Sequence, residues 1–440
     1  MDLLFRAYGV ASDDEGGEGE GEGKELAAPA SKRPRSEGHP PEQGPSPLVA
    51  VRHHRPSSGT TEAPLAAGRY VSKRERAILA ASSSVSDPSP PFPPTVITSP
   101  VVGTLLDSDL PSDILASLKC QKNVHARNKK VPDRLSVALH GHTKAVNSVQ
   151  WSQSHGHLLA SAGMDHTVHV WNVWRRNQQK ARVFKFHDAA VKNVRWSPQG
   201  LSLLSCGYDC SSRLVDVEKG IETQLFKEDQ IVEVIKFHPG ESNLFLSGGS
   251  KGFLRLWDIR VGMVIQEYLR GLGSILDIEF SADGKHFISS SDTSKSRVSE
   301  NSIIVWDVSR QVPLSNQVYT EAYTCPCIRY HPSDACFVAQ SNGNYIAIFS
   351  ARAPFKLDRY RRYENHGVWG FPIKCNFSLD GQELASGSSD GCMYFYSYKS
   401  SALVRKIKAF EQACIDVAFH PMMPNVIASC SWTGEVSVFE

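Results

Sequence analysis

The chain has 440 residues, of which 41% are hydrophobic and 21% are charged, and its formal net charge at pH 7 is +2. This composition is typical of a globular protein that is too long for one ordinary domain. Because the charge is nearly balanced, an overall positive electrostatic field cannot be the basis of nucleic-acid binding. Any such contact has to come from a local cluster of basic residues.

The sequence divides into two parts of different composition. All eight tryptophans lie from Trp151 onward, whereas sixteen of the 25 prolines precede Arg134. We therefore expect a disordered, acidic and Pro/Ser-rich tail over residues 1–133 and a folded domain over residues 134–440. The first ten residues are too short an apolar run for a signal peptide, and no eighteen apolar residues run together. These features favour a location in the cytosol or the nucleus.

Three segments of the tail differ from their surroundings. Residues 13–25 alternate acidic residues with glycine, and the basic clusters at 32–35 and 73–76 suit either a nuclear import receptor or simple solvation. Residues 95–118 are more apolar. This leaves open whether they fold back on the domain or on a partner.

From Leu135 the chain repeats with a period in the forties. Alternating apolar runs, each following a turn rich in Gly, Asp, Ser or Asn, end at Trp171, Val215, Trp257, Trp306, Phe349, Tyr396 and Phe439. Further alternating runs precede each of them, and three strands plus a linking fourth make one propeller blade. The sequence thus predicts an all-β, seven-bladed β-propeller.

The same pattern predicts how the ring closes. The last run ends at Phe439 and has no fourth strand after it. An unpaired edge strand invites association, so a strand from elsewhere should cover it. We expect residues 134–140 to pair beside the run that ends at Phe439.

The first repeat resembles the WD-repeat family, because Gly141-His142, Ser161, Asp165 and Trp171-Asn172 match its signature positions. The resemblance implies a buried tetrad in which His142 bridges Asp165 and the Ser161 hydroxyl, which reaches the Trp171 ring nitrogen. The second and sixth repeats lack the tryptophan but keep the other three members, which are His187, Ser205 and Asp209, and His366, Ser386 and Asp390. The other four repeats lack the histidine, so the blades should differ in rigidity.

No pattern of catalytic or cofactor-binding residues stands out. His142, Ser161 and Asp165 superficially form a Ser-His-Asp set, but their spacing is that of the structural tetrad. The ten cysteines contain no CxxC pair, and Cys325 and Cys327 are too close for a zinc finger. We expect no enzyme activity, cofactor or metal, and buried or half-buried thiols in a reducing compartment.

In the family, partners commonly dock on the face formed by the turns between the second and third strands. The resemblance places there the residues before the turn aspartate, namely Met164, Tyr208, Ser250, Asn342, Ser389 and Trp432, with Glu300 as an uncertain fourth position because residues 292–301 are inserted. Tyr208 and Trp432 are the strongest candidates, since aromatic residues are enriched in binding hot spots. The alternative is that either ring packs on a neighbouring blade.

A second candidate surface is the sequence RYRRY at residues 359–363. Arg359, Arg361 and Arg362 alternate with aromatic rings there, a mixture suited to RNA phosphates and stacked bases. A solvated outer strand explains the pattern equally well.

Several stretches, among them SNGNYIAIFS and RRYENHGVWGF, resemble a narrower WD-repeat group, that of WD repeat-containing protein 25 and pre-mRNA-processing factor 17. This resemblance covers residues 135–440 and implies a nuclear scaffold of splicing complexes, with protein partners and an RNA contact but no membrane or small-molecule substrate. The alternative functions are a substrate receptor of a cullin-type ubiquitin ligase and a subunit of another multiprotein complex. Against the ligase, only residues 257–260 show its WDxR pattern.

Overall fold

The computed structural model describes residues 103–119, 131–200, 202–292, 302–317 and 324–440. All of them belong to one compact unit, and the second unit, Gly9–Pro94, lies wholly outside the described residues. The expected tail up to residue 102 and its two basic clusters are therefore not covered by the structural description.

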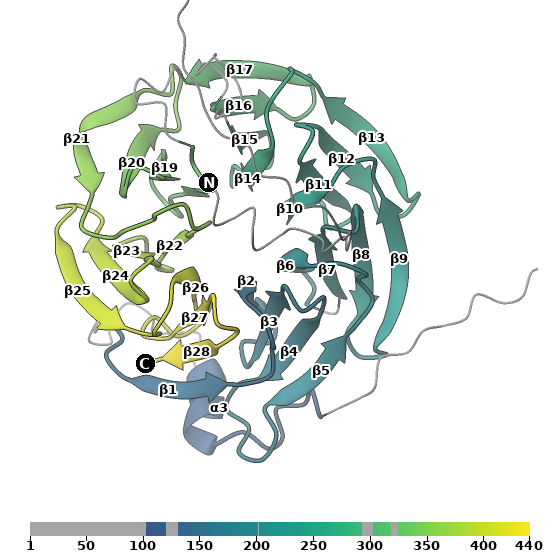
Figure 1. Ribbon diagram of the computed structural model, residues 1–440, viewed down its shortest axis with the longest axis vertical. Coiled ribbons are helices and arrows are strands. Elements are labelled where there is room, and N and C mark those ends of the chain that lie inside the picture. The colour runs from purple at the N-terminus through teal and green to yellow at the C-terminus, as the bar shows by residue number, and fades with distance from the viewer. Residues whose placement is uncertain (1–102, 120–130, 201, 293–301, 318–323) are drawn as a thin grey trace, which may run out of the picture. The chain divides into compact units, whose positions relative to one another are not determined.

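Seven four-stranded antiparallel sheets surround a common axis, which confirms the predicted seven-bladed propeller (Figure 1). Blade 1 consists of β2 (Val146–Trp151), β3 (Leu158–Gly163), β4 (Val168–Asn172) and β5 (Lys180–Phe184), and blade 2 consists of β6 (Val191–Trp196), β7 (Ser202–Gly207), β8 (Ser211–Asp216) and β9 (Ile221–Lys227). Blade 3 consists of β10 (Val232–Phe237), β11 (Leu244–Gly249), β12 (Leu254–Asp258) and β13 (Met263–Tyr268), and blade 4 consists of β14 (Ile275–Phe280), β15 (His286–Ser291), β16 (Ile303–Asp307) and β17 (Val312–Gln317). Blade 5 consists of β18 (Cys327–Tyr330), β19 (Cys336–Ser341), β20 (Tyr345–Ser350) and β21 (Leu357–Tyr363), and blade 6 consists of β22 (Cys375–Phe377), β23 (Glu383–Ser386), β24 (Cys392–Ser397) and β25 (Leu403–Lys408). Blade 7 consists of β26 (Cys414–Phe419), β27 (Ile427–Ser431), β28 (Val436–Phe439) and β1 (Leu135–Leu139).

The core lies between the blades. The middle strands are buried on both faces, as every residue of β3 and β19 is, whereas the outer strand β25 alternates between exposed and half-buried residues. A sheet covered on both faces needs apolar or small side chains at every position, which explains why strands such as LLASAG lack a polar face. The first strand of each blade lies near the axis and the last lies at the rim (Figure 1).

The ring is closed by β1, as predicted. β1 pairs antiparallel with β28, and Leu135 lies opposite Phe439. The backbone of Glu440 extends this pairing, since its N–H donates to the Arg134 carbonyl at 3.0 Å and its carbonyl accepts from the N–H groups of Asp133 and Arg134. The edge of blade 7 is thereby covered by a strand from the other end of the domain.

Three histidines at the ends of inner strands join neighbouring blades. The Nε2 atoms of His238, His331 and His420 donate to the carbonyls of Gly284, Gly381 and Gly156, respectively, at 2.8 to 3.0 Å. Each bond reaches the next blade around the ring, and the last one crosses from blade 7 to blade 1. Burial lowers the pKa of His420 to about 4, so this histidine is neutral at physiological pH.

Residues 103–119 lie against blade 1, although they fall within the interval assigned to the tail. The N–H of Gly103 donates to the Ala181 carbonyl at 3.0 Å, and the Asn172 side chain donates to the Leu106 carbonyl at 3.0 Å. Leu110 is buried, at 7% exposed. We call residues 103–119 the strap.

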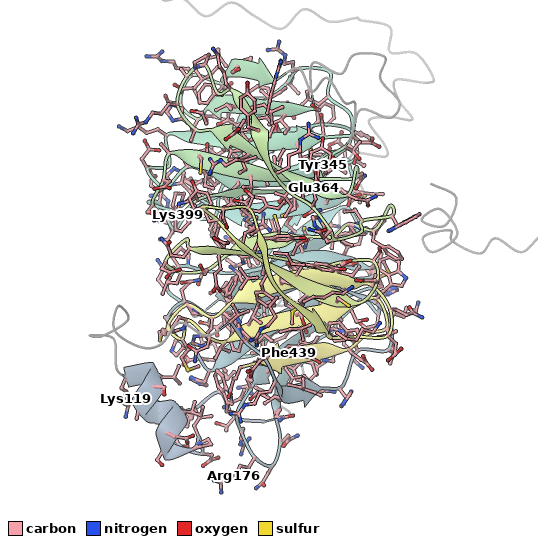
Figure 2. The ribbon with its side chains drawn as sticks, turned by 90° about the vertical axis from the view of Figure 1, so that its left-hand side faces the viewer. Lys119, Arg176, Tyr345, Glu364, Lys399 and Phe439 are labelled. Carbon is pink, nitrogen blue, oxygen red and sulfur yellow. The ribbon has the colours of Figure 1, made fainter. Side chains whose placement is uncertain are left out.

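The strap ends in the helix α3 (Ser112–Lys119). Asp113 lies in the first turn, where the helix dipole favours a negative charge, and Lys119 lies in the last turn, where it favours a positive charge. Ile114, Leu115 and Leu118 pack against the hydrophobic cluster at the junction of blades 7 and 1. Figure 2 shows Lys119 on the same side of the ribbon as Lys399, which lies in a turn between a third and a fourth strand. No helix in the described residues is long and apolar enough to cross a membrane.

Candidate interaction face

One backbone hydrogen bond marks the same turn position in all seven blades. The N–H of a residue that follows the second strand, directly in six blades and three residues later in blade 6, donates at 2.8 to 3.0 Å to a carbonyl in the loop entering the blade. The donors are Met164, Tyr208, Ser250, Asp292, Asn342, Ser389 and Trp432. The six residues predicted from the sequence therefore hold equivalent positions. Asp292 holds the fourth one, whereas Glu300 lies outside the described residues.

At all seven positions the side chains are buried or half-buried. Met164 is buried, at 8% exposed, so its side chain offers little surface to a partner. Tyr208 is half-buried, with the Lys192 ammonium 5.4 Å from its ring centroid. Trp432 is also half-buried and packs edge-to-face on Phe371 at a centroid distance of 5.3 Å. Part of the surface of both Tyr208 and Trp432 is thus covered by contacts within the protein.

The tetrad of blade 1 has every hydrogen bond that the resemblance implies. Trp171 Nε1 donates to Ser161 Oγ at 2.8 Å, Ser161 lies 2.8 Å from His142 Nε2, and His142 Nδ1 lies 3.0 Å from Asp165. Burial opposes ionisation of Asp165, but hydrogen bonds from His142 and Thr167 outweigh it and hold its pKa well below the usual range. The network ties the loop, both middle strands and their turn together.

The related residues of blade 2 keep part of this network. His187 lies 2.9 Å from Asp209 through Nδ1 and 2.8 Å from Ser205 through Nε2. Blades 3 and 4 keep only the other half, in which Trp257 donates to Ser247 at 3.0 Å and Trp306 donates to Ser289 at 2.8 Å.

Blade 6 has a different network from the one its residues suggest. His366 Nδ1 bonds the Tyr396 hydroxyl at 2.8 Å, and His366 Nε2 bonds Gln340 of blade 5 at 2.6 Å. The Tyr396 hydroxyl thus takes the ring nitrogen that contacts the turn aspartate in blades 1 and 2. Ser386 also bonds Gln340, at 3.2 Å, so this glutamine joins blades 5 and 6. Burial lowers the pKa of His366 to about 4.

The tetrad offers little to catalysis or metal binding. Ser161 is fully buried, and its oxygen is already bonded to His142 and Trp171. Atoms of His142, Asp165 and His169 lie within 4.8 Å of one another, a grouping that could hold a metal ion. A metal on His142 Nδ1 would, however, remove the proton that binds Asp165 and break the network.

The nine described cysteines are free thiols. Eight are buried and Cys210 is half-buried. Cys327 and Cys375 are 3.9 Å apart between their sulfur atoms and pack in the core between blades 5 and 6. Burial raises the pKa of Cys325 to about 12, which keeps it protonated and unreactive.

The most exposed tryptophan was not singled out by the sequence analysis. Trp369 lies in the loop between β21 and β22, is 79% exposed and has a φ of 48°. Glycines flank it, and a Cβ on Gly367 would lie 2.6 Å from the Trp369 ring nitrogen. A bulky residue with positive φ is strained, and such strain is concentrated at functional sites. The signal in the sequence was a tryptophan between two glycines in a loop.

Trp369 lines a pocket of about 390 Å³ on this face. Its other residues are Asn344, Asn365, His366, Gly367, Ser389, Asp390 and Tyr394. Burial opposes ionisation of Asp390, but hydrogen bonds from Ser388, Lys406 and Tyr394 hold its pKa well below the usual range. The pocket therefore combines an indole wall with a charged carboxylate and several amides. Of the predicted positions, only Ser389 contributes to it.

The arginines of the predicted RNA contact lie in or beside a bulge of the outer strand β21. A register shift between β20 and β21 pairs Arg362 with Ala347 and Asp358 with Ile348, which leaves residues 359–361 bulged. Arg361 bonds Asp358 at 2.9 Å, and the Arg362 guanidinium lies 4.7 Å from the ring centroid of Tyr345. Arg359 is exposed. An RNA contact here stays a prediction.

Comparisons with known proteins agree with this architecture. A family model of the WD domain, G-beta repeat, matches residues 134–172 and 178–216. WD repeat-containing protein 25 of Mus musculus is 34% identical, and the alignment covers 84% of this chain and 69% of that protein. Pre-mRNA-processing factor 17 is 30% identical in Mus musculus, over 75% of this chain and 56% of the factor, and 28% identical in Saccharomyces cerevisiae, over 68% and 65%. The chain thus spans less than two thirds of either processing factor. The chain belongs to the WD-repeat family of β-propeller proteins.

Proposed function

We propose that this protein is a non-catalytic scaffold of nuclear pre-mRNA splicing complexes. The observation that carries the proposal is the similarity to pre-mRNA-processing factor 17, which extends over 68% to 75% of this chain in the two organisms. An alignment of that extent includes most of the propeller. The nuclear location rests on the same similarity.

The docking surface of this scaffold is the Trp369 pocket together with Phe371 and Trp432. Trp369 is the one exposed tryptophan of the eight, and an exposed, strained indole beside a pocket is typical of a protein-binding hot spot. The carboxylate of Asp390 and the amides of Asn344 and Asn365 give the partner polar groups to pair with. A partner that inserts an apolar side chain against the indole and hydrogen-bonds these groups fits the surface best.

The absence of catalysis in this proposal is supported by the burial of the Ser161 hydroxyl. A nucleophile has to reach a substrate, whereas Ser161 has no exposed surface. Its histidine and aspartate neighbours are equally committed to the fold, because His142 and Asp165 fix the loop and turn of blade 1.

Affinity purification from nuclear extract tests the proposal. The full chain, Trp369→Ala and Val404→Ala are each tagged, and bound proteins are identified by mass spectrometry. Val404 is the control, because it is 52% exposed and lies on the outer strand β25 of blade 6. We expect small nuclear ribonucleoprotein proteins with the wild type and with Val404→Ala, and their loss with Trp369→Ala.

Two results would contradict the proposal in different ways. Recovery of a cullin adaptor in place of splicing proteins would establish the ligase alternative. The Asp258–Arg260 pair of the WDxR sequence, joined at 2.6 Å, would then be the contact to test next. Splicing proteins that remain bound to Trp369→Ala would keep the scaffold function but move its docking surface elsewhere.

A further inference from the structure

A second pocket of the propeller lies beside the tetrad of blade 1 and shares no residue with the Trp369 pocket. Its volume is about 580 Å³, within the range of about 300–1,000 Å³ that is typical of ligand pockets. Its walls come from the loop before β2, the turn between β3 and β4, the strands β4 and β5, and the loop before β6. Because Lys180 and Lys185 line it, we call it the lysine pocket.

Two ammonium groups of the lysine pocket have no ion-pair partner among the described residues. Lys180 is the first residue of β5 and is half-buried, and Lys185 directly follows β5 and is exposed. The Lys180 nitrogen lies 5.6 Å from the ring centroid of Trp171. A Cβ on Gly141 would lie 2.5 Å from the same nitrogen, so the glycine leaves space for the ammonium group. Both cations are therefore available to a ligand.

The Asp165 carboxylate also lines the pocket, but it is committed to the fold. Its side chain is only 8% exposed. Its two oxygens accept hydrogen bonds from the His142 ring, from the N–H of Thr143, and from the N–H and the hydroxyl of Thr167. Little of this carboxylate is left to balance the charges of the two lysines.

The pKa of His169 reports the resulting positive potential. This histidine is buried in the pocket wall, and burial lowers its pKa to about 2. The charges of His142, Lys180 and Lys185 act in the same direction, and only Asp165 opposes them. Surroundings that disfavour a cation in this way favour an anion.

We propose that the lysine pocket binds the phosphate group of a phosphorylated serine or threonine. Such a group carries a charge of about −1.5 to −2 at pH 7, which matches the two lysines, whereas a carboxylate brings only one negative charge. Lysine binds phosphate as a point charge on a flexible stem, and this suits one half-buried and one exposed ammonium group. The exposed Thr143 at the pocket has a hydroxyl that can donate to a phosphate oxygen.

The lining of the pocket favours a phosphorylated protein over RNA. Proteins that bind single-stranded RNA combine a basic groove along the backbone with aromatic rings on which bases stack. Among the described residues, no Phe, Tyr or Trp lines the lysine pocket, and its lysines both come from one short stretch of chain. This arrangement can hold one phosphate group but gives bases no stacking surface.

The tail of this chain supplies a serine close to the pocket. Ser99 precedes Pro100, a dipeptide that proline-directed kinases recognise, and it lies outside the described residues. A kinase would transfer the terminal phosphoryl group of ATP to its hydroxyl oxygen, releasing ADP and the hydroxyl proton. Ser99 is four residues before Gly103, and a Cβ on Gly103 would lie 2.7 Å from the carbonyl oxygen of Lys180. Four residues span up to about 14 Å, so the phosphate of Ser99 is the ligand we expect.

Fluorescence polarisation with the full-length, unphosphorylated protein tests the site. The probes are a labelled peptide of residues 95–102 with phosphate on Ser99, the same peptide without phosphate, and a phosphopeptide of shuffled sequence. We expect the first probe to bind at least about tenfold more tightly than the second, because charge-assisted contacts are lost without the phosphate. Preference for the first probe over the shuffled one would assign the site to Ser99. Equal binding of both phosphopeptides would support the phosphate site with a partner protein as the source.

Matched lysine variants show where the phosphopeptide binds. Lys185→Gln removes an exposed side chain, so the protein should keep its melting temperature while its affinity falls about tenfold. The control Lys227→Gln removes the same charge from the exposed end of β9 and should bind as the wild type does.

Three results would overturn the proposal. The first is equal affinity for the phosphorylated and unphosphorylated peptides of residues 95–102. The second is unchanged binding of both phosphopeptides in a folded protein that carries Lys180→Gln and Lys185→Gln together. The third is displacement of the phosphopeptide by a single-stranded RNA that binds more tightly, because the pocket would then serve RNA.

Discussion

The indole N–H of Trp174 donates to the carboxylate of Glu440 at 3.0 Å, across the junction of the first and last blades. The same carboxylate oxygen accepts from the Ser136 hydroxyl of β1 at 2.8 Å. Glu440 thereby joins three segments that close the ring: the end of the third strand of blade 7, its outer strand β1, and the loop after β4 in blade 1. The closure is held by side chains as well as by the strand ladder.

A chain that starts at Gly141 should aggregate. It lacks β1, so β28 is left as an unpaired apolar edge and Trp174 loses part of its surroundings. Size-exclusion chromatography and thermal unfolding measure the effect, with a chain starting at residue 103 as the control that keeps the strap and β1. A soluble chain from Gly141 that melts cooperatively would show that β1 is dispensable.

Ser161→Ala should destabilise the protein more than Ser205→Ala. Ser161 bonds both His142 and Trp171, whereas Ser205 bonds only His187, because Val215 replaces the tryptophan in blade 2. Each buried group left unpaired costs about 1–3 kcal/mol, so the loss in blade 1 should be roughly twice that in blade 2. Urea unfolding measures both values. Equal losses would mean that the Trp171 bond contributes nothing to stability.

Stability should fall as the pH drops from about 6.5 to about 4. The folded pKa values of His366 and His420 are both lowered to about 4, so the unfolded chain binds protons first in this window. Each histidine contributes up to about 3 kcal/mol to this loss. The free energy of unfolding of His420→Gln should therefore depend less steeply on pH than that of the wild type. The same replacement at the exposed His166 is the control, and an unchanged slope in His420→Gln would contradict the prediction.

The carboxylates give a second, lower window. Burial raises the pKa of Asp209 but its hydrogen bond to His187 outweighs this, and the net value is about 2. Its stabilising effect is complete above the unfolded pKa of about 4 and is lost as the pH falls toward 2. Asp209→Asn should reduce the loss of stability only below pH 4, as measured by urea unfolding at a series of pH values.

Leu110→Ala should release the strap from the propeller. Leu110 is buried in the cluster that contains Trp151 and Trp174. Truncating such a leucine costs about 2–5 kcal/mol, and here the loss weakens the packing of residues 103–119 on the propeller. Limited proteolysis should then cut within the strap. Leu106→Ala is the matched control, because Leu106 lies in the same segment and is 67% exposed. Equal protection in both variants would mean that Leu110 does not anchor the strap.

The two tryptophans of the docking surface should differ in their effect on stability. Trp432→Ala removes a half-buried ring that packs edge-to-face on Phe371 and should cost about 1–3 kcal/mol. Trp369→Ala removes an exposed ring and should change stability by less than about 0.5 kcal/mol. Thermal unfolding of both variants measures this, and a large loss for Trp369→Ala would make that ring part of the core.

The blades could be predicted because their signal is local. Alternation and turn residues repeat within each copy, so the anchor residues Trp257 and Tyr396 fall in the third strands β12 and β24 as expected. The fourth turn position is harder to predict for a local reason too. The insertion separates Asp292, which makes the backbone bond of this turn, from the next strand, and Glu300 at its other end lies outside the described residues.

Other features depend on contacts that no short pattern contains. Lys236 and Arg195 both precede the final aromatic residue of an inner strand, and only the arrangement of carboxylates shows which of them lacks a partner. The eight residues of α3 are too few to be a stable helix alone, and packing on blades 7 and 1 decides their structure. In blade 6, the hydroxyl of Tyr396 binds His366 in place of the contact with Asp390 that the residues shared with blade 1 suggest.

The pairing of β1 with β28 makes closure of the ring wait until both ends of the propeller have been synthesised. Ser136 and Glu440 are 304 residues apart, and at a typical elongation rate the ribosome needs roughly 15 to 60 s to cover that distance. During this time the emerging β1 has no native partner. A nascent chain of this protein therefore carries β1 as an unpaired strand until β28 has emerged from the ribosome.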